Sequence, residues 1–170
     1  IDVLVNNAGY GMMGAIEEVT DAEVRKQYET NVFGALDVMR AVLPHMRRQR
    51  SGHILNLSSV GGMVSFPGAG IYCSTKFAIE ALSEAMAKEV APLGIKITIV
   101  EPGAFRTNFN GSSLSTTENL IDDYDEAIGG FREWVRDVDG EQPGDPAKAV
   151  EAMIKAVNNK ESTLRLPLGA

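Results

Sequence analysis

Residues 58–76 decide how the rest of the sequence is interpreted, and they read SSVGGMVSFPGAGIYCSTK. A glycine-rich loop in this stretch leads into a helical pattern that contains Tyr72 and Lys76. Side chains four residues apart share one face of a helix, so the spacing places an ammonium beside a phenol. A nearby cation favours the ionised phenol and lowers its pKa, which is ordinarily near ~10. The pair therefore predicts a tyrosine that exchanges a proton with a substrate oxygen.

Short apolar runs surround this stretch on both sides. Residues 1–5, 53–57 and 95–100 are mostly apolar, and each run stops at turn residues. Such runs are typical of strands that are buried on both faces of a parallel sheet. Residues 164–168 predict one further strand at an edge of the sheet, because Pro167 cannot donate a ladder hydrogen bond.

Helical patterns alternate with these strands. Thr20 and Glu23 form a capping-box signature, and apolar residues then recur every three or four positions as far as residue 50. Asn31 and Gly34 lie inside this helix; they are either tolerated there or loosen it locally. Residues 72–91 predict a second long helix, and Asp145 followed by Pro146 opens a third. Residues 131–138 predict only one or two amphipathic turns.

The order of these elements predicts an α/β fold: a Rossmann-like, doubly wound parallel sheet in a single domain, residues 1–170. Ligands of such sheets bind beyond the carboxyl ends of the strands. Those ends carry small or polar residues here, namely Asn6 to Gly9, Ser58 with Ser59, and Pro102 with Gly103. A Tyr-x-x-x-Lys pair alone is a weak signal, but its place beside this edge makes it a candidate site.

Composition excludes several classes of function. The net charge of −7 argues against a nucleic-acid partner, and Cys73 is the only cysteine. Two distant histidines, His45 and His53, argue against a metal site. No apolar run reaches the ~18 residues of a membrane span, so the sequence predicts no membrane partner and a cytoplasmic location.

Five motifs occur together in order: Asn-Asn-Ala-Gly at 6–9, Asn-Val-Phe-Gly at 31–34, Ser58 with Ser59, Tyr-Cys-Ser-Thr-Lys at 72–76, and Pro102 with Gly103. In this set and spacing the chain resembles the short-chain dehydrogenase/reductase family from residue 1 to residue 168. The resemblance implies an NAD(P)-dependent oxidoreductase that interconverts a secondary alcohol and a ketone or aldehyde.

The resemblance also implies roles for individual residues. Tyr72 would be the general acid/base, and Lys76 would lower its pKa and hold the cofactor ribose. Ser59 would hydrogen-bond the substrate oxygen, and Asn31 would keep a water that links Lys76 to solvent. Further cofactor contacts would come from two groups of residues, Asn7, Ala8 and Gly9 on the adenosine side and Pro102, Gly103, Phe105 and Thr107 on the nicotinamide side. The cofactor would be NAD or NADP, and no metal is implied.

The family's opening glycine-rich motif, T-G-x-x-x-G-x-G, has no match in this sequence. We therefore expect the chain to be the C-terminal portion of a longer protein, with the first strands missing. On that expectation the 170 residues alone bind the cofactor poorly and turn over little substrate, and residues 1–6 present an unpaired, apolar sheet edge.

The substrate is expected to be apolar, because the loops after the strands carry Met12, Met13, Met63, Val64, Phe66, Phe105 and Phe109. A small-molecule substrate is the expected partner. The helices that begin near Thr20 and Tyr72 are those the family uses for assembly, which implies a homodimer or homotetramer. Two alternatives remain open: a non-catalytic nicotinamide-binding regulator, and an epimerase or dehydratase of the related extended group.

Overall fold

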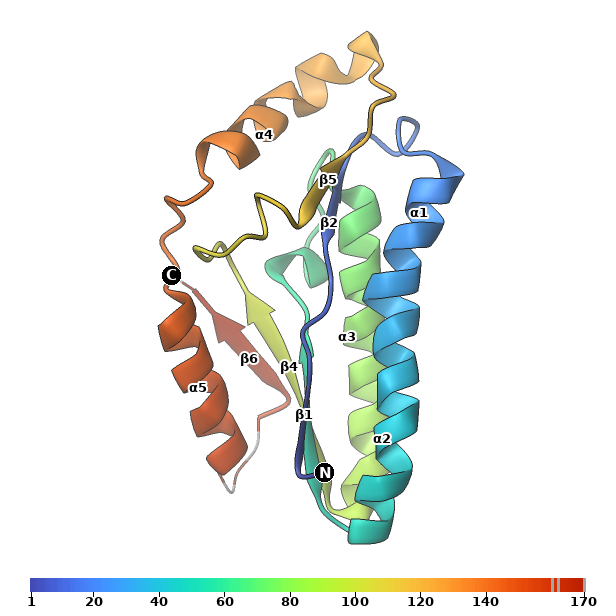
Figure 1. Ribbon diagram of the computed structural model, residues 1–170, viewed down its shortest axis with the longest axis vertical. Coiled ribbons are helices and arrows are strands. Elements are labelled where there is room, and N and C mark those ends of the chain that lie inside the picture. The colour runs from blue at the N-terminus through green and yellow to red at the C-terminus, as the bar shows by residue number, and fades with distance from the viewer. Residues whose placement is uncertain (160, 162, 170) are drawn as a thin grey trace.

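The structure is a computed structural model that describes residues 1–159, 161 and 163–169. Within these residues one sheet has four strands in the order β1-β3-β4-β6, all parallel. Its strands are β1 (Val3–Asn6), β3 (Gly52–Leu57), β4 (Ile95–Pro102) and β6 (Arg165–Leu168) (Figure 1). All four predicted strands are therefore confirmed, including the edge position of β6 and its Pro167.

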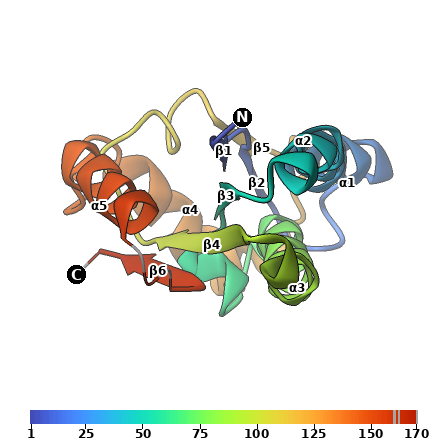
Figure 2. The same ribbon diagram turned by 90° about the horizontal axis from the view of Figure 1, so that it is seen from below.

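Helices cover both faces of this sheet (Figure 2). One side carries α1 (Asp21–Tyr28), α2 (Ala35–Gln49) and α3 (Gly70–Val90), and the other carries α5 (Pro146–Asn158). Three short 3₁₀ turns lie between elements, at Val60–Gly62, Ala91–Leu93 and Asp122–Tyr124. Helices on both faces of a parallel sheet confirm the predicted Rossmann-like, doubly wound α/β fold.

The predicted long helix from Thr20 is confirmed, with one interruption. The Thr20 hydroxyl accepts a hydrogen bond from the Glu23 N–H at 3.3 Å, and the Glu23 carboxylate accepts one from the Thr20 N–H at 2.8 Å. Between α1 and α2 the backbone widens into a π-helical segment, Glu29–Gly34. This segment contains Asn31, so the reading in which the helix is loosened locally is the correct one.

The expectation that the first strand is buried on both faces is wrong. β1 lies at the end of the sheet and pairs with β3, while Leu4 packs against the core beneath α2. The opposite face of β1 carries Val3 and Val5, which are 41% and 44% exposed. An apolar run predicts burial on both faces, and in this structure only one face of the strand is covered.

A second, smaller ribbon was not predicted. β2 (Gly11–Met13) pairs in parallel with β5 (Leu114–Thr116), far away in the chain. After β5 comes α4 (Asp125–Asp137), which is longer than the one or two turns predicted there. Three-residue strands are too short for a periodic pattern, and the two glycines inside α4 lowered its apparent helical propensity.

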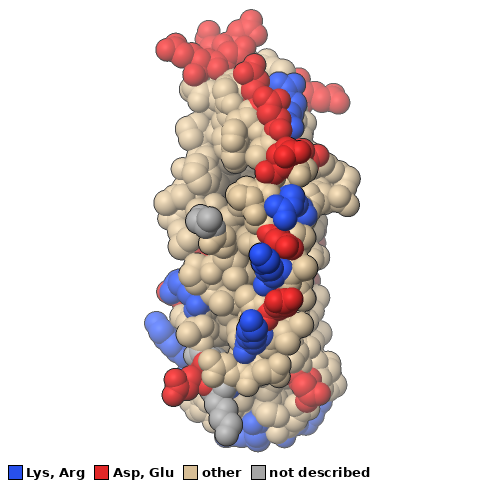
Figure 3. Space-filling model, turned by 90° about the vertical axis from the view of Figure 1, so that its left-hand side faces the viewer, with Lys and Arg blue, Asp and Glu red and all other residues tan. Residues whose placement is uncertain are grey.

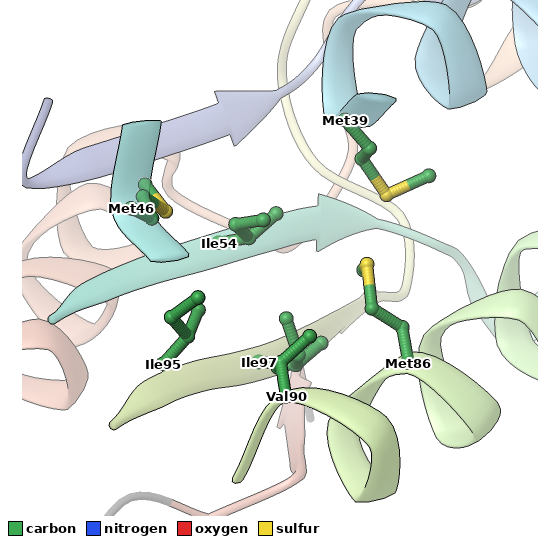
Figure 4. Close-up of a cluster of buried hydrophobic side chains, with 7 residues drawn as sticks. All are labelled: Met39, Met46, Ile54, Met86, Val90, Ile95 and Ile97. Atoms are coloured by element: carbon green, nitrogen blue, oxygen red, sulfur yellow. The ribbon is translucent and has the colours of Figure 1, made fainter. Parts of the chain in front are cut away.

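The main core lies between the sheet and the pair α2 and α3 (Figure 4). We call it the closed cluster; its buried members are Met39, Met46, Ile54, Met86, Val90, Ile95 and Ile97. Side chains from two helices and two strands meet in it, and all are less than 9% exposed. This packing fixes α3, and with α3 the positions of Tyr72 and Lys76, against the end of β3.

Candidate active site

The carboxyl ends of β1, β3 and β4 surround one end of a cavity of about 590 Å³. Residues of α3, α4, α5 and β5 also line it. Among the described residues that line the cavity, Lys76 is the only charged one. Ser58, Ser59 and Tyr72 line the same end as Lys76, so the predicted catalytic group is brought together in one place.

Ser59 is held where the chain leaves β3. Its hydroxyl accepts a hydrogen bond from the Gly61 N–H at 3.1 Å, and so caps the 3₁₀ turn Val60–Gly62. A Cβ on Gly61 would lie 3.3 Å from the Tyr72 ring and 3.6 Å from the Ser59 hydroxyl. Glycine at this position therefore lets the serine and the tyrosine approach each other. Sequence reasoning noted only that this loop is rich in glycine.

Lys76 is buried, and its ammonium donates a hydrogen bond to the Leu57 carbonyl at 2.8 Å. Burial lowers the pKa of Lys76 to about 8, because the charged form loses solvation. The nitrogen lies 5.8 Å from the centre of the Tyr72 ring, so the two side chains do share one face of α3 as predicted.

The pKa of Tyr72 departs from the expectation. Burial raises it to about 12; a hydrogen bond with Ser59 acts in the opposite direction, and Cys73 adds a small increase. In the protein alone, desolvation of the phenolate is the largest influence on this pKa. The expectation that Lys76 lowers it stays a prediction.

Asn31 lies in the π-helical segment and is 2% exposed. Its amide accepts a hydrogen bond from the Tyr10 N–H at 3.1 Å and donates to the Tyr10 carbonyl at 2.9 Å. The same amide nitrogen lies 3.2 Å from the Thr75 hydroxyl. Asn31 therefore connects the loop after β1 to α3, which it contacts at Thr75, the residue before Lys76.

The residues predicted to contact a cofactor mostly line the cavity. These lining residues are Asn7 and Gly9 after β1, Pro102 at the end of β4, and Gly103, Phe105 and Thr107 in the loop that follows. Ala8 is exposed and is not among the lining residues. The Gly103 N–H donates to the Leu168 carbonyl at 2.8 Å, which ties the loop after β4 to β6.

The apolar wall agrees with the prediction only in part. Met12, Met13, Phe66, Phe105 and Phe109 line the cavity, as expected. Met63 and Val64 do not; they are 48% and 49% exposed, because the 3₁₀ turn directs the chain away from the cavity. The wall also includes apolar residues that were not singled out as lining, among them Ala149, Val150 and Met153 of α5, and Leu114, Phe131, Trp134 and Val135. The apolar spacing of the last three was visible in the sequence, but their place opposite Tyr72 was not.

Ser58 differs from its neighbour. Its side chain is 2% exposed, and its hydroxyl has no hydrogen-bond partner among the described residues.

The residues that the structure describes contain no group of three or more His, Cys, Asp or Glu side chains arranged to hold a metal ion. The helices of the described residues include none long and apolar enough to cross a membrane.

Comparison with known proteins gives a consistent result. The model of the family described as short chain dehydrogenase matches residues 1–118. A curated 3-ketodihydrosphingosine reductase from Bacteroides thetaiotaomicron is 40% identical over 172 residues, which cover 99% of this chain and 63% of that protein. A solved short-chain dehydrogenase from Streptomyces avermitilis is 48% identical with a TM-score of 0.91, covering 100% of this chain and 61% of that one.

A second solved structure, ElxO with NADP bound, is 30% identical with a TM-score of 0.74, and the match covers 98% of this chain and 65% of that one. The chain spans about three-fifths of the length of the first curated relatives it matches. The family model covers more than half of the chain, and the relatives named above are oxidoreductases by name or family. The chain belongs to the short-chain dehydrogenase/reductase family of oxidoreductases.

Proposed function

We propose that this chain carries the catalytic residues of an NAD(P)-dependent oxidoreductase that interconverts a secondary alcohol and a carbonyl compound with an apolar body. The observation that carries the proposal is the meeting of Ser59, Tyr72 and Lys76 at one end of an otherwise uncharged cavity. Family membership supports the reaction class, and the Bacteroides relative is named as a 3-ketodihydrosphingosine reductase.

The residues around Gly9 fit a nicotinamide dinucleotide. A Cβ on Gly9 would lie 3.2 Å from the Asn31 amide oxygen and 3.8 Å from the Lys76 nitrogen, so the glycine leaves this edge of the cavity open. The Lys76 ammonium has three protons and gives one to Leu57, which leaves two for hydroxyl groups of a ribose. When bound, the cofactor supplies or accepts the hydride. The NADP bound in the ElxO structure supports NADP as the cofactor, and NAD is the alternative.

Tyr72 and Ser59 carry the proton chemistry in this proposal. With a pKa raised to about 12 by burial, Tyr72 is protonated at neutral pH and can donate its proton to a carbonyl oxygen as negative charge develops there. Ser59 donates a hydrogen bond to the same oxygen, which stabilises that charge.

The character of the cavity wall supports an uncharged, apolar substrate. Met12, Met13 and Phe109 line it close to Tyr72, and the rings of Phe109 and Tyr72 lie 5.5 Å apart. No arginine lines the described part of the wall, so it has no partner for a carboxylate or phosphate beyond Lys76. We therefore propose ketones with a hydrocarbon tail as the substrate class.

The test is Tyr72→Phe in the whole protein, assayed with dec-2-one and each reduced cofactor. We expect turnover to fall by about 10²–10⁴-fold, because the proton donor is removed. Binding of NADPH or NADH, followed by fluorescence, is expected to stay within about twofold, since the phenol hydroxyl is one contact among many. Retained turnover would refute the assignment of Tyr72.

The same assay separates the two alternatives. A nicotinamide-binding regulator would bind the cofactor and reduce no ketone in a broad panel. An epimerase or dehydratase would consume its substrate without net oxidation of the reduced cofactor. Intact Ser59, Tyr72 and Lys76 support the oxidoreductase over the regulator.

We also propose that the whole protein is a homodimer or homotetramer. Phe33, Val38 and Phe77 are 48%, 43% and 45% exposed on the helical side of the molecule, and a second copy would bury them. Sedimentation of the whole protein tests this, and a monomer at micromolar concentration would contradict it. A cytoplasmic location stays a prediction.

A further inference from the structure

One carboxylate outside the catalytic group is unusually well enclosed. Glu18, in the loop between β2 and α1, is 0% exposed. One of its oxygens accepts a hydrogen bond from the Ile121 N–H at 2.9 Å, and the other accepts one from the Ala15 N–H at 2.7 Å. The second oxygen also lies 2.5 Å from a terminal nitrogen of Arg132 in α4. A buried charge of this kind needs a partner, and here its partner is a single arginine.

The pair connects segments that are distant in the chain. The backbone carbonyl of Glu18 accepts hydrogen bonds from the Thr117 hydroxyl at 3.1 Å and the Asn119 amide at 3.2 Å. Arg132 is only 14% exposed and reaches Asp125, at the start of its own helix, with its other terminal nitrogen at 3.1 Å. Burial alone would raise the pKa of Glu18, but hydrogen bonds from Arg132, Ile121 and Ala15 outweigh it and lower that pKa below its usual range. The carboxylate therefore stays ionised and the pair stays charged near neutral pH.

Helix α4 presents a different face to the cavity. Phe131, Trp134 and Val135 are spaced at i, i+3 and i+4, and all three line the cavity wall. The ring of Phe131 stacks between Phe66, at 6.1 Å, and Trp134, at 5.8 Å. The surface over α4 and α5 carries a strip of charged side chains, mostly acidic at its upper end (Figure 3). The aromatic rings therefore line the cavity from a helix whose surface also carries charged side chains, and Trp134 among them is 51% exposed.

We propose that Arg132, through its ion pair with Glu18, is a positioning residue that fixes the aromatic face of α4 over the cavity and thereby sets the length of apolar tail that the site accepts. The inference rests on the proposed oxidoreductase function. Arg132 follows Phe131 directly in the chain, so a rotation of α4 that breaks the pair also moves the stacked rings. Tyr72 and Phe131 pack against the same buried group, which includes Val135. Under this proposal the tail of a long ketone held at Tyr72 would contact the aromatic face, and a short ketone would not.

The test compares three variants of the whole protein. Arg132→Met removes the charge and keeps the stem, Arg132→Lys restores a cation, and Arg136→Met is the matched control on an exposed part of the same helix. Each is assayed with dec-2-one and with butan-2-one. For Arg132→Met we expect KM for dec-2-one to rise about tenfold with kcat little changed, and kcat/KM for butan-2-one to stay within about twofold. Arg132→Lys is expected to recover part of the loss, and Arg136→Met to match the parent protein.

A second measurement does not depend on turnover. Trp134 is the only tryptophan of this chain, so its quenching by acrylamide reports on the aromatic face. Trp134→Phe supplies the blank. In the parent protein we expect dec-2-one to lower the quenching constant of Trp134. In Arg132→Met we expect a higher quenching constant that dec-2-one no longer lowers. Arg136→Met is expected to behave as the parent protein does.

The outcomes separate the two proposals. If no ketone is reduced by the parent protein but Arg132→Met still loosens Trp134, the oxidoreductase proposal fails and the positioning role stands. Equal loss of both ketones in Arg132→Met, or quenching and KM values equal to those of Arg136→Met, would overturn the role of Arg132. Should Arg132→Met fail to fold, Arg132→Lys decides the matter. If Arg132→Lys keeps the preference of the parent protein for dec-2-one over butan-2-one, the positioning role of the ion pair is supported. If it loses this preference while the quenching of Trp134 stays as in the parent protein, that role is contradicted.

Discussion

Two apolar clusters of this protein are built from similar residues but differ in their surroundings, since one is enclosed and the other borders a cavity. The closed cluster joins α2 and α3 to the sheet, and Met46 and Ile54 in it are 0% exposed. The second, which we call the cavity cluster, consists of Met13, Ala69, Cys73 and Val135 with Phe66, Tyr72, Leu114 and Phe131 packed against it. It borders open space, and its neighbour Trp134 is 51% exposed. The first cluster stabilises the fold, and the second forms part of the cavity wall.

The two regions are also held by different forces. Lys76 is fixed by a backbone carbonyl of the adjacent strand, at Leu57, and by the packing of α3. The aromatic face of α4 is fixed through the ion pair of Arg132 with Glu18. A hydrogen bond to a strand moves only if the sheet moves, whereas an ion pair between loops and a helix can break locally. The catalytic end is therefore expected to be rigid and the wall opposite it adjustable.

Met46→Ala gives the largest expected effect. Removing a fully buried side chain from the closed cluster leaves a cavity, so the free energy of unfolding should fall by about 2–5 kcal/mol. Urea denaturation followed by circular dichroism measures it. KM for dec-2-one should not change. A loss below about 1 kcal/mol would show that this cluster repacks easily, and the contrast with the cavity cluster would then disappear.

Gly61→Ala tests how tightly the catalytic end is packed. The new Cβ would lie 3.2 Å from the Cys73 sulfur and 3.3 Å from the Tyr72 ring, so the ring must shift by a few tenths of an ångström. We expect kcat to fall about tenfold, because proton transfer depends on this geometry. The matched control is Gly129→Ala in α4, whose Cβ meets nothing within 4 Å. Unchanged kcat in Gly61→Ala would mean that the catalytic end tolerates movement as readily as α4.

The smallest expected effect is a dependence of stability on pH that arises at His53. This residue precedes Ile54 in β3, so its side chain lies on the face of the sheet opposite the closed cluster. Its Nε2 lies 2.8 Å from the Thr98 hydroxyl, which itself donates to the Thr163 carbonyl, so Nε2 must be the donor. Nδ1 is buried without a hydrogen-bond partner among the described residues. Burial, and then the charge of Lys96, lower the pKa of His53.

Because that pKa is lowered, the unfolded chain binds the proton more readily than the folded one. Stability should therefore fall as pH drops from about 6.5, the ordinary histidine value, to the lower folded pKa. Urea midpoints at pH 7.5 and 5.5 measure the change, and His53→Gln should reduce it. His45→Asn, on the exposed part of α2, is the control. An equal reduction in both variants would rule out His53 as the source.

Residues with local signals were predictable from the sequence. The capping box at Thr20 and Glu23, the buried strands 53–57 and 95–100, and the spacing of Tyr72 and Lys76 all follow from nearest neighbours along the chain. The meeting of Ser59 with Tyr72 and Lys76 was predictable because Ser59 follows the end of a strand and the helix of Tyr72 and Lys76 begins one loop later. Asn31 is a poor helix former, and its place inside a helical pattern indicated a local irregularity. The structure has a π-helical segment at that position.

The remaining features depend on contacts between distant parts of the chain. The pairing of β2 with β5, the aromatic wall of α4 and the burial of Glu18 arise where segments about a hundred residues apart meet. The raised pKa of Tyr72 likewise comes from burial, which no spacing encodes. The exposed face of β1 was mispredicted for the same reason, since an apolar run does not specify what covers it.

The parallel ribbon of β2 and β5 has a consequence for the order of folding. Gly11 pairs with Leu114, so this contact closes a loop that includes α1, α2, α3 and two strands of the main sheet. Closing so long a loop costs entropy that a three-residue strand repays only weakly. We therefore expect the sheet and its helices to form first and the ribbon to join last. Amide hydrogen exchange should then be faster at Met12 and Ser115 than in β3, and the cavity would be the last part of the molecule to take shape.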